Sequence, residues 1–119
     1  MKTSTDYERF LKEYINFCIK DIDGINTRML GELVEDKDAG EEAWGFVTYN
    51  PNDDENYHEG KVTLICFGAT VDDDIMVLID KSIFFKAIYD ACIEDMAKYP
   101  ESAEKVRRLL LQIQKDLGL

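Results

Sequence analysis

The stretch KVTLICF, residues Lys61–Phe67, decides the fold class of this 119-residue chain. It is short, rich in aliphatic and β-branched residues, and bounded by Gly60 and Gly68, which is typical of a β-strand. WGFVTY at residues 44–49 and IMVLI at residues 75–79 share this character. The connections between the three stretches are too short for helical crossovers, so we expect antiparallel neighbours in one sheet. The stretches at residues 61–67 and 75–79 carry apolar residues at successive positions, which predicts strands that are covered on both faces.

Helical periodicity precedes the strands. Apolar residues recur at steps of three and four from residue 7 to residue 22, which predicts a long first helix. Thr5 and Glu8 form a capping-box pattern at its start. A short second helix is expected to begin at Asn26 or Thr27, because both residue types are common N-caps.

Two further helices are predicted after the strands. Ser82 is the expected N-cap of the first, and Tyr99-Pro100 ends it. The clearest helical period of the chain covers residues 106–117 and ends at Gly118. We therefore expect one α+β domain over residues 1–119, with a small antiparallel sheet of about three strands packed with about four helices, and helices at both chain ends.

The composition is strongly acidic. Asp and Glu outnumber Lys and Arg by 25 to 14, for a net charge of −11. Such a charge repels nucleic acid and membrane surfaces and attracts basic proteins or cations. A run of charges is ordinarily a solvated face, and that explanation stays open at this point. The acids gather in three segments that we expect to be loops: Glu35, Asp36, Asp38, Glu41 and Glu42; Asp53, Asp54, Glu55 and Glu59; and Asp72, Asp73 and Asp74.

Antiparallel pairing predicts how these acids are arranged around the sheet. The start of the first strand lies beside the end of the second. Glu41 and Glu42 are therefore expected near the Asp72–Asp74 triplet, and the Asp53–Glu59 segment is expected at the opposite end. The domain would then carry two negative poles.

The cysteines and the terminal sequence indicate where the protein acts. Cys18, Cys66 and Cys92 are an odd number and stand among apolar neighbours, which favours buried, reduced thiols over a disulfide or a zinc site. The N-terminal residues carry charges throughout and contain no apolar signal region, and no apolar run approaches transmembrane length. We expect a cytoplasmic protein without membrane contacts.

Few residues form a catalytic or metal-binding pattern. His58 is the only histidine, and no Ser or Cys lies in a nucleophile turn, so we expect no catalytic residue and no cofactor. Residues 50–56 alternate Asn, Asn, Asp and Asn as in a calcium loop, but Glu55 stands where that loop needs glycine. Calcium binding is therefore a less favoured alternative, and no other metal is expected. The basic residues are scattered, which predicts no direct contact with nucleic acid.

The remaining function class is recognition of another protein. The loop Asp53–Glu59 places Tyr57 and His58 among acids, and aromatic rings beside charges are typical of interface anchors. Trp44 stands in a similar relation to the other acidic pole. The alternative, that Trp44 belongs to the core and Tyr57 is an ordinary loop residue, remains open here.

The second half of the chain resembles a known family in several short motifs. These are Glu59-Gly60-Lys61-Val62, Phe67-Gly68, Ile79-Asp80, Tyr89-Asp90-Ala91-Cys92, Tyr99-Pro100-Glu101, Lys105-Val106 and Leu109-Leu110. Together they resemble the C-terminal half of the immunity proteins of bacterial contact-dependent growth inhibition, particularly those paired with ribonuclease toxins. The resemblance runs from Glu59 to Ile113, and the N-terminal half carries no pattern that we can place in the family.

The resemblance implies a small cytoplasmic inhibitor without catalytic activity, which binds a cognate toxin domain and covers its active site or substrate surface. A ribonuclease is basic where it holds RNA phosphates, so an acidic inhibitor can present carboxylates to the same groove. An acidic regulatory domain with another basic partner is the main alternative, and the oligomeric state stays open. The expected toxin-binding residues are Asp53, Asp54, Glu55, Tyr57, His58 and Glu59, with Asp72, Asp73, Asp74, Glu41 and Glu42 as a second surface.

Overall fold

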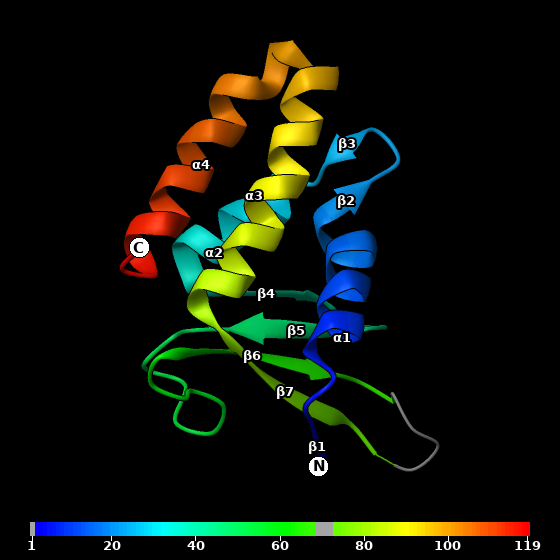
Figure 1. Ribbon diagram of the computed structural model, residues 1–119, viewed down its shortest axis with the longest axis vertical. Coiled ribbons are helices and arrows are strands. Elements are labelled where there is room, and N and C mark those ends of the chain that lie inside the picture. The colour runs from blue at the N-terminus through cyan, green and yellow to red at the C-terminus, as the bar shows by residue number, and fades with distance from the viewer. Residues whose placement is uncertain (1, 69–72) are drawn as a thin grey trace.

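The computed structural model describes residues 2–68 and 73–119. Within these residues, a five-stranded mixed sheet has the strand order β1-β7-β6-β5-β4, and β2 and β3 form a separate two-stranded hairpin. The helices lie over one face of the five-stranded sheet (Figure 1). The α+β class predicted from the sequence is therefore confirmed.

The three predicted strands form the centre of the sheet and are antiparallel, as predicted. They are β5 at Gly45–Thr48, β6 at Lys61–Cys66 and β7 at Ile75–Asp80. Two edge strands are added to them: β4 at Asp38–Glu41 is antiparallel to β5, and β1 at Lys2–Ser4 is parallel to β7. The predictions of about three strands and of a helix at the N-terminal end are therefore wrong. Neither edge strand has the apolar alternation by which a strand is predicted from sequence. Each is held in place by backbone hydrogen bonds to a neighbouring strand.

The first helix ends earlier than predicted. After Ile19 the chain forms β2 at Lys20–Asp21 and β3 at Gly24–Ile25, and the N–H of Asn26 donates to the Ile19 carbonyl over 2.8 Å. Ile22 lies in the turn of this hairpin and is almost fully exposed, so the predicted helix over residues 7–22 is wrong at its end. The helical elements are α1 at Tyr7–Tyr14, the π-helical turn η1 at Ile15–Ile19, α2 at Thr27–Asp36, α3 at Lys81–Lys98, the 3-10 turn η2 at Pro100–Ser102 and α4 at Ala103–Asp116.

One of the three predicted helix caps is confirmed. The side chain of Asn26 accepts a hydrogen bond of 3.1 Å from the backbone N–H three residues later. The capping box at Thr5 is wrong, because α1 begins after Asp6 and no side chain caps it. Ser82 is not the N-cap of α3, because β7 runs directly into the helix and Asp80 occupies that position.

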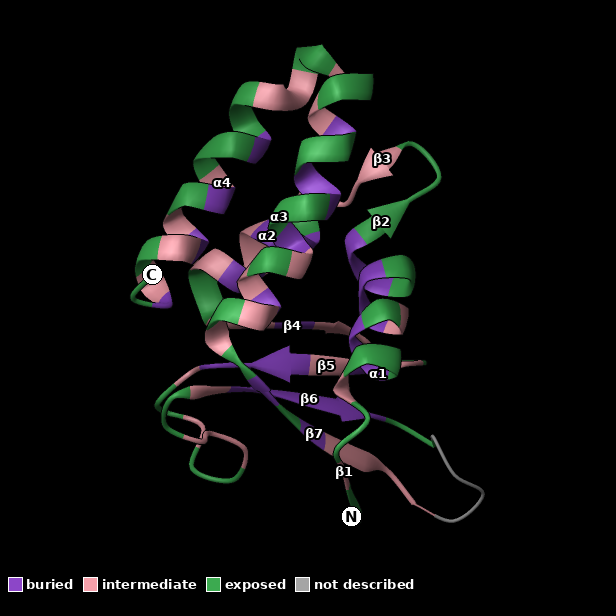
Figure 2. Cartoon of the chain, viewed as in Figure 1, coloured by how far each residue is buried: buried purple, intermediate pink, exposed green. Residues whose placement is uncertain are grey.

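The core lies between the helices and one face of the sheet (Figure 2). Helices α1 and α3 pack on β6 and β7, α2 packs on β4, and α4 packs on α2 and α3. Side chains alternate along a strand, so Val62 and Leu64 of β6 face the helices together with Val77 of β7. The apolar stripe predicted for α4 is confirmed, because Leu110 and Ile113 are buried.

Leu110 and Leu111 provide a matched test of this packing. Leu110 is 4% exposed and its neighbour Leu111 is 59% exposed. Leu110→Asp would bury an unpaired carboxylate and is expected to lower the free energy of unfolding by about 3 kcal/mol or more, whereas Leu111→Asp should change it by less than about 1 kcal/mol. Urea titrations followed by circular dichroism measure both values. Equal losses in the two variants would contradict the assignment of the buried face.

Candidate functional site

The acidic loop, defined here as residues 50–60 between β5 and β6, is folded by its own side chains. Asn50 Oδ1 accepts from the N–H of Asn52 over 2.9 Å, and Asp53 Oδ1 accepts from the N–H of Asn56 over 3.1 Å. Asn50 Nδ2 donates to the carbonyl of Asp36 over 3.0 Å, which ties the loop to the end of α2. One side-chain oxygen of the calcium-like spacing, Asn50 Oδ1, therefore already accepts a hydrogen bond from the loop itself.

His58 attaches the acidic loop to the sheet. Its Nδ1 lies 2.9 Å from the Asn56 carbonyl oxygen and 3.2 Å from Thr63 Oγ1, and the Thr63 hydroxyl donates to the same carbonyl over 2.6 Å. Because Leu64 faces the helices, its neighbour Thr63 points to the opposite side of β6. The loop is therefore held against the face of the sheet that the helices do not cover.

The exposed carboxylates of the acidic loop are left without ion pairs. Asp54, Glu55 and Glu59 are exposed, and none of them pairs with a basic group among residues 2–68 and 73–119. Asp38 of β4 lies near two other acids: partial burial raises the pKa of its carboxyl, and the charges of Asp36 and Asp53 raise it further. The negative potential is thus concentrated at this end of the sheet.

The second predicted acidic surface is divided by the fold. The register places Gly45 opposite Cys66 and Cys66 opposite Ile75, so its acids share one end of the sheet. Strands β4 and β7 are, however, three strand spacings apart, or about 14 Å. The prediction that these acids come close together is therefore wrong in distance, though correct about the end of the sheet.

Some carboxylates of that second surface form ion pairs or hydrogen bonds within the protein. Glu41 lies in β4 rather than in a loop, and its Oε1 is 3.2 Å from Arg28 Nη2 of α2, whereas Glu42 is exposed in the following turn. Asp74 Oδ1 accepts from the N–H of Gly68 over 2.9 Å, and Asp73 Oδ1 accepts from the N–H of Asp74. Asp72 lies outside the described residues.

The two aromatic candidates have different surroundings. Trp44 is partly buried, packs against the core, and its ring centroid lies 5.8 Å from that of Tyr14, a core residue. Its surroundings therefore favour the core alternative over an interface anchor. Tyr57 stays half-buried in the acidic loop, where its backbone N–H donates to the Asp53 carbonyl over 2.9 Å.

The outer face of the sheet, on the side away from the helices, contains apolar residues that sequence reasoning did not select. The register aligns Phe46, Ile65 and Met76 across β5, β6 and β7. Leu78 follows on β7, and the ring centroid of Phe67 lies 5.8 Å from that of Phe46. We expected β6 and β7 to be covered on both faces. This is confirmed for β6, which is buried from Val62 to Cys66, and is wrong for β7, where Leu78 is 39% exposed. The helices cover only one face of the sheet (Figure 1). Antiparallel strands need no crossover helix on the second face.

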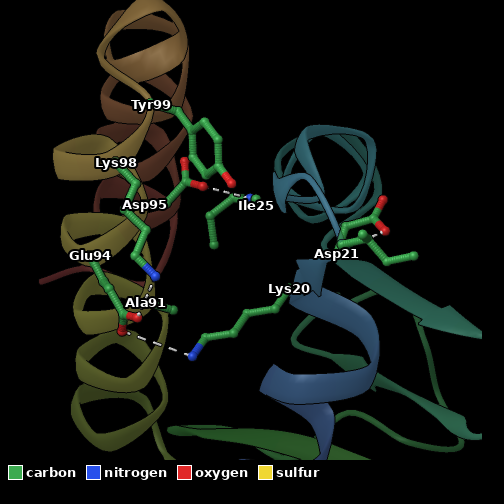
Figure 3. A pocket seen from close by; sticks show the side chains of 10 residues that line it. Lys20, Asp21, Ile25, Ala91, Glu94, Asp95, Lys98 and Tyr99 are labelled. Atoms are coloured by element: carbon green, nitrogen blue, oxygen red, sulfur yellow. Dashed lines mark hydrogen bonds and ion pairs between the residues drawn. The ribbon is translucent and has the colours of Figure 1, made fainter.

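One cavity of about 140 Å³ lies beside the β2–β3 hairpin (Figure 3). Asp95 of α3 is nearly buried there, and its Oδ1 accepts from the N–H of Ile25 over 2.8 Å. Glu94 pairs loosely with Lys20 and with Lys98, at 4.0 and 3.6 Å. The polar groups of this cavity therefore fasten the hairpin to α3, which gives the cavity a structural role.

The cysteine side chains are free and buried, as predicted. Burial raises the pKa of Cys18 to about 11 and the pKa values of Cys66 and Cys92 to about 12. Thiols with such values are protonated at neutral pH and are poor nucleophiles. The structure therefore gives none of these cysteines an activated thiolate.

Two other kinds of site are absent from the described residues. No group of three or more His, Cys, Asp or Glu side chains is arranged to hold a metal ion within residues 2–68 and 73–119. Over the same residues, no helix is both long enough and apolar enough to cross a membrane.

An acidic loop held beside a partly exposed apolar sheet face has the combination of charged rim and apolar centre that is typical of protein-binding domains. A sequence model of the CDI immunity protein family matches residues 7–110, so the chain belongs to this family, which neutralises toxins of contact-dependent growth inhibition. The match confirms the resemblance seen in the second half and extends it to the N-terminal half. Neither the curated proteins nor the solved structures contained a match to this chain.

The attachment of the hairpin to α3 can be tested at Gly24. This residue has φ +122°, and a Cβ there would lie 2.4 Å from Asp95 Oδ1, whereas a Cβ at Gly60 (φ +79°) would meet nothing within 4 Å. Gly60→Ala is expected to lower the free energy of unfolding by about 1–2 kcal/mol through backbone strain alone. Gly24→Ala should lower it by about 1–3 kcal/mol more, because the Asp95 hydrogen bond is displaced. Similar urea midpoints for the two variants would contradict this account.

The buried thiols predict slow alkylation and a loss of stability in alkali. At pH 8 iodoacetamide should leave the folded protein unmodified by mass spectrometry and should modify three sites after denaturation. Thiols of the unfolded chain ionise near their ordinary pKa of 9.0, whereas burial raises the pKa values in the folded protein to about 11 to 12. The unfolded chain therefore binds fewer protons in this range, so the free energy of unfolding should fall as pH rises from about 9 to 12. Rapid alkylation of the folded protein would contradict the burial of the thiols.

Proposed function

We propose that this protein is a cytoplasmic, non-enzymatic inhibitor that binds one cognate toxin domain, a basic ribonuclease, and covers its active site or RNA-binding surface. Membership of the CDI immunity protein family supports the toxin as partner. The acidic loop is the single observation that supports a basic partner surface. The loop is held to the sheet through His58 and Thr63, yet its exposed carboxylates Asp54, Glu55 and Glu59 have no ion-pair partner within the described part of the chain.

Electrostatics explains why such a loop suits inhibition of a ribonuclease. The enzyme must present Lys and Arg to the RNA phosphates, and a carboxylate-rich loop can occupy those same groups. Charge complementarity raises association from about 10⁵–10⁶ to about 10⁸–10⁹ M⁻¹s⁻¹. Rapid capture favours the cell, because an inhibitor has to act before the toxin has cleaved many RNA molecules.

The surroundings of the reactive side chains support a role in binding rather than catalysis. The His58 ring nitrogen contacts a backbone carbonyl and a hydroxyl that hold the loop in place. The thiol of Cys66 is kept protonated by burial. Inhibition by this protein therefore consumes one inhibitor molecule for each toxin molecule.

The acidic loop is a stronger candidate for toxin contact than the second acidic surface. On that surface Glu41 is already paired with Arg28, and Asp74 accepts a backbone hydrogen bond. Glu42 and Asp73 could contribute to the field around the toxin, but they lie next to β4 and β7, which are not neighbouring strands. Within the acidic loop, Asp53 holds the loop conformation, and Tyr57 supplies a half-buried ring beside the free carboxylates.

Neutralising the free carboxylates of the loop tests this proposal. The triple variant Asp54→Asn, Glu55→Gln, Glu59→Gln should fold normally, because exposed like charges contribute little to stability. It should associate at least about tenfold more slowly at low salt with the toxin domain encoded directly upstream of its gene, because steering is lost. The dependence of the association rate on ionic strength should also flatten, since such fields are screened over about 10 Å at 0.1 M salt. Stopped-flow mixing measures both.

The matched control variant also neutralises one Asp and two Glu residues, but at positions far from the sheet: Asp23→Asn, Glu101→Gln, Glu104→Gln. These residues are exposed in the hairpin turn and near the start of α4, at the opposite end of the molecule (Figure 1). Association should change by less than about twofold in this control. An equal slowing in both triple variants would show that only net charge matters. Failure of the unaltered protein to bind or inhibit the upstream toxin domain would reject the toxin partner and favour another basic partner.

A further inference from the structure

We propose that the toxin docks on the outer face of the five-stranded sheet, with an apolar segment of the toxin seated on Phe67, Met76 and Leu78 and its flanking Lys and Arg on the acidic loop. This inference rests on the proposed function, because it takes the toxin as the partner. It adds that the affinity comes from the apolar sheet face, which no sequence motif indicates. The acidic loop then supplies orientation and speed.

The register makes the apolar residues contiguous. Phe46 is the pairing partner of Ile65, and Ile65 is the partner of Met76, so the three side chains form one row across three strands. Side chains directly opposite on neighbouring strands lie about 4.5–5.5 Å apart. Phe67 extends the row beside Phe46, with ring centroids 5.8 Å apart, and Leu78 lies next to Met76 on the same side of β7.

The apolar row is buried at its centre and exposed at its margin, and the exposed margin indicates a docking surface. Ile65 at its centre is 2% exposed although it is not part of the core beneath the helices, so its own neighbours on the outer face shield it. Leu78 and Phe67 at its margin are each 39% exposed. A monomeric protein seldom leaves contiguous apolar side chains on its surface unless they contact a partner.

The apolar row and the acidic loop lie toward opposite ends of the outer face. The apolar row lies toward the end of the sheet where β7 begins, and a threonine row follows, in which Thr48 pairs with Thr63. The acidic loop closes the other end, because Thr63 Oγ1 holds it there. A partner that fits this face must place apolar side chains beside a basic group, which matches a protein with an RNA-binding surface.

A second exposed apolar area lies on α3 and α4, and its charge does not suit a basic partner. It includes Tyr89, Ile93 and Leu111, and a groove between them is also lined by Arg107 and by no acidic residue. A basic toxin surface would meet a like charge there. The outer sheet face is therefore the surface that charge complementarity selects, and the α3–α4 area provides a matched control.

Leu78→Asn and Ile93→Asn are the matched pair that tests the docking surface. The two side chains are similarly exposed, at 39% and 44%, and lie on the two different apolar areas. Leu78→Asn should raise the dissociation rate from the upstream toxin domain by about tenfold with little change in association, because loss of a contact acts on dissociation. Ile93→Asn should change either rate by less than about twofold. Biolayer interferometry with immobilised toxin domain measures both rates.

A second substitution separates contact from folding. Leu78→Thr keeps a residue that favours strands and should also raise the dissociation rate, with an unchanged thermal midpoint by circular dichroism. If the unaltered protein binds the toxin and neither substitution at Leu78 changes dissociation, the docking surface is wrong and the proposed function survives. If Ile93→Asn has the larger effect, the α3–α4 area is the docking surface. If sedimentation shows a dimer that Leu78→Thr dissociates without weakening toxin binding, a second copy of the chain covers this face and the inference is rejected.

Discussion

The pairing register of β5, β6 and β7 is the constraint on which the rest of the structure depends. It places Leu64 and Val77 opposite each other beneath the helices, and it aligns Phe46, Ile65 and Met76 on the other side. Because side chains alternate with a period of two, a slip of one residue would exchange these two sets. The same register also decides which end of the sheet receives the acidic loop. Core, docking face and charge are therefore arranged by one set of backbone hydrogen bonds.

The one-sided covering of the sheet follows from how strands and helices are joined. β7 runs directly into α3, with Asp80 as the last strand residue and Lys81 as the first of the helix, and α1 follows β1 after only two residues. Such short joints bring both helices onto one face, where α2 and α4 pack around them. The strand connections add no helix to the second face, where the acidic loop is held against Thr63 and Leu78 stays exposed. An interaction surface results without any additional element.

The excess Asp and Glu residues do not form one interaction surface, because some of their carboxylates form ion pairs or hydrogen bonds within the protein. Glu41 is held by an arginine of α2, and Asp95 accepts a backbone hydrogen bond that fastens the β2–β3 hairpin. Asp54, Glu55 and Glu59 have no such partner among the described residues. A carboxylate that is already paired contributes less to the field that a partner meets than one that is free. The local backbone and the reach of neighbouring basic groups thus decide which acids can serve recognition.

The sequence by itself determined the central strands, most of the helices, the buried thiols, the acidic character and the family. These properties depend on periodicity and composition, which local residue patterns carry directly. Only the tertiary structure decided the edge strands, the hairpin that shortens the first helix, and the outer face of the sheet. The strands β1 and β4 form because a neighbour offers hydrogen bonds, and Leu78 stays exposed because no helix covers that face of β7. Apolar residues on both faces of a strand look identical in sequence whether the second face is covered by the protein itself or left for a partner, because burial depends on what packs there.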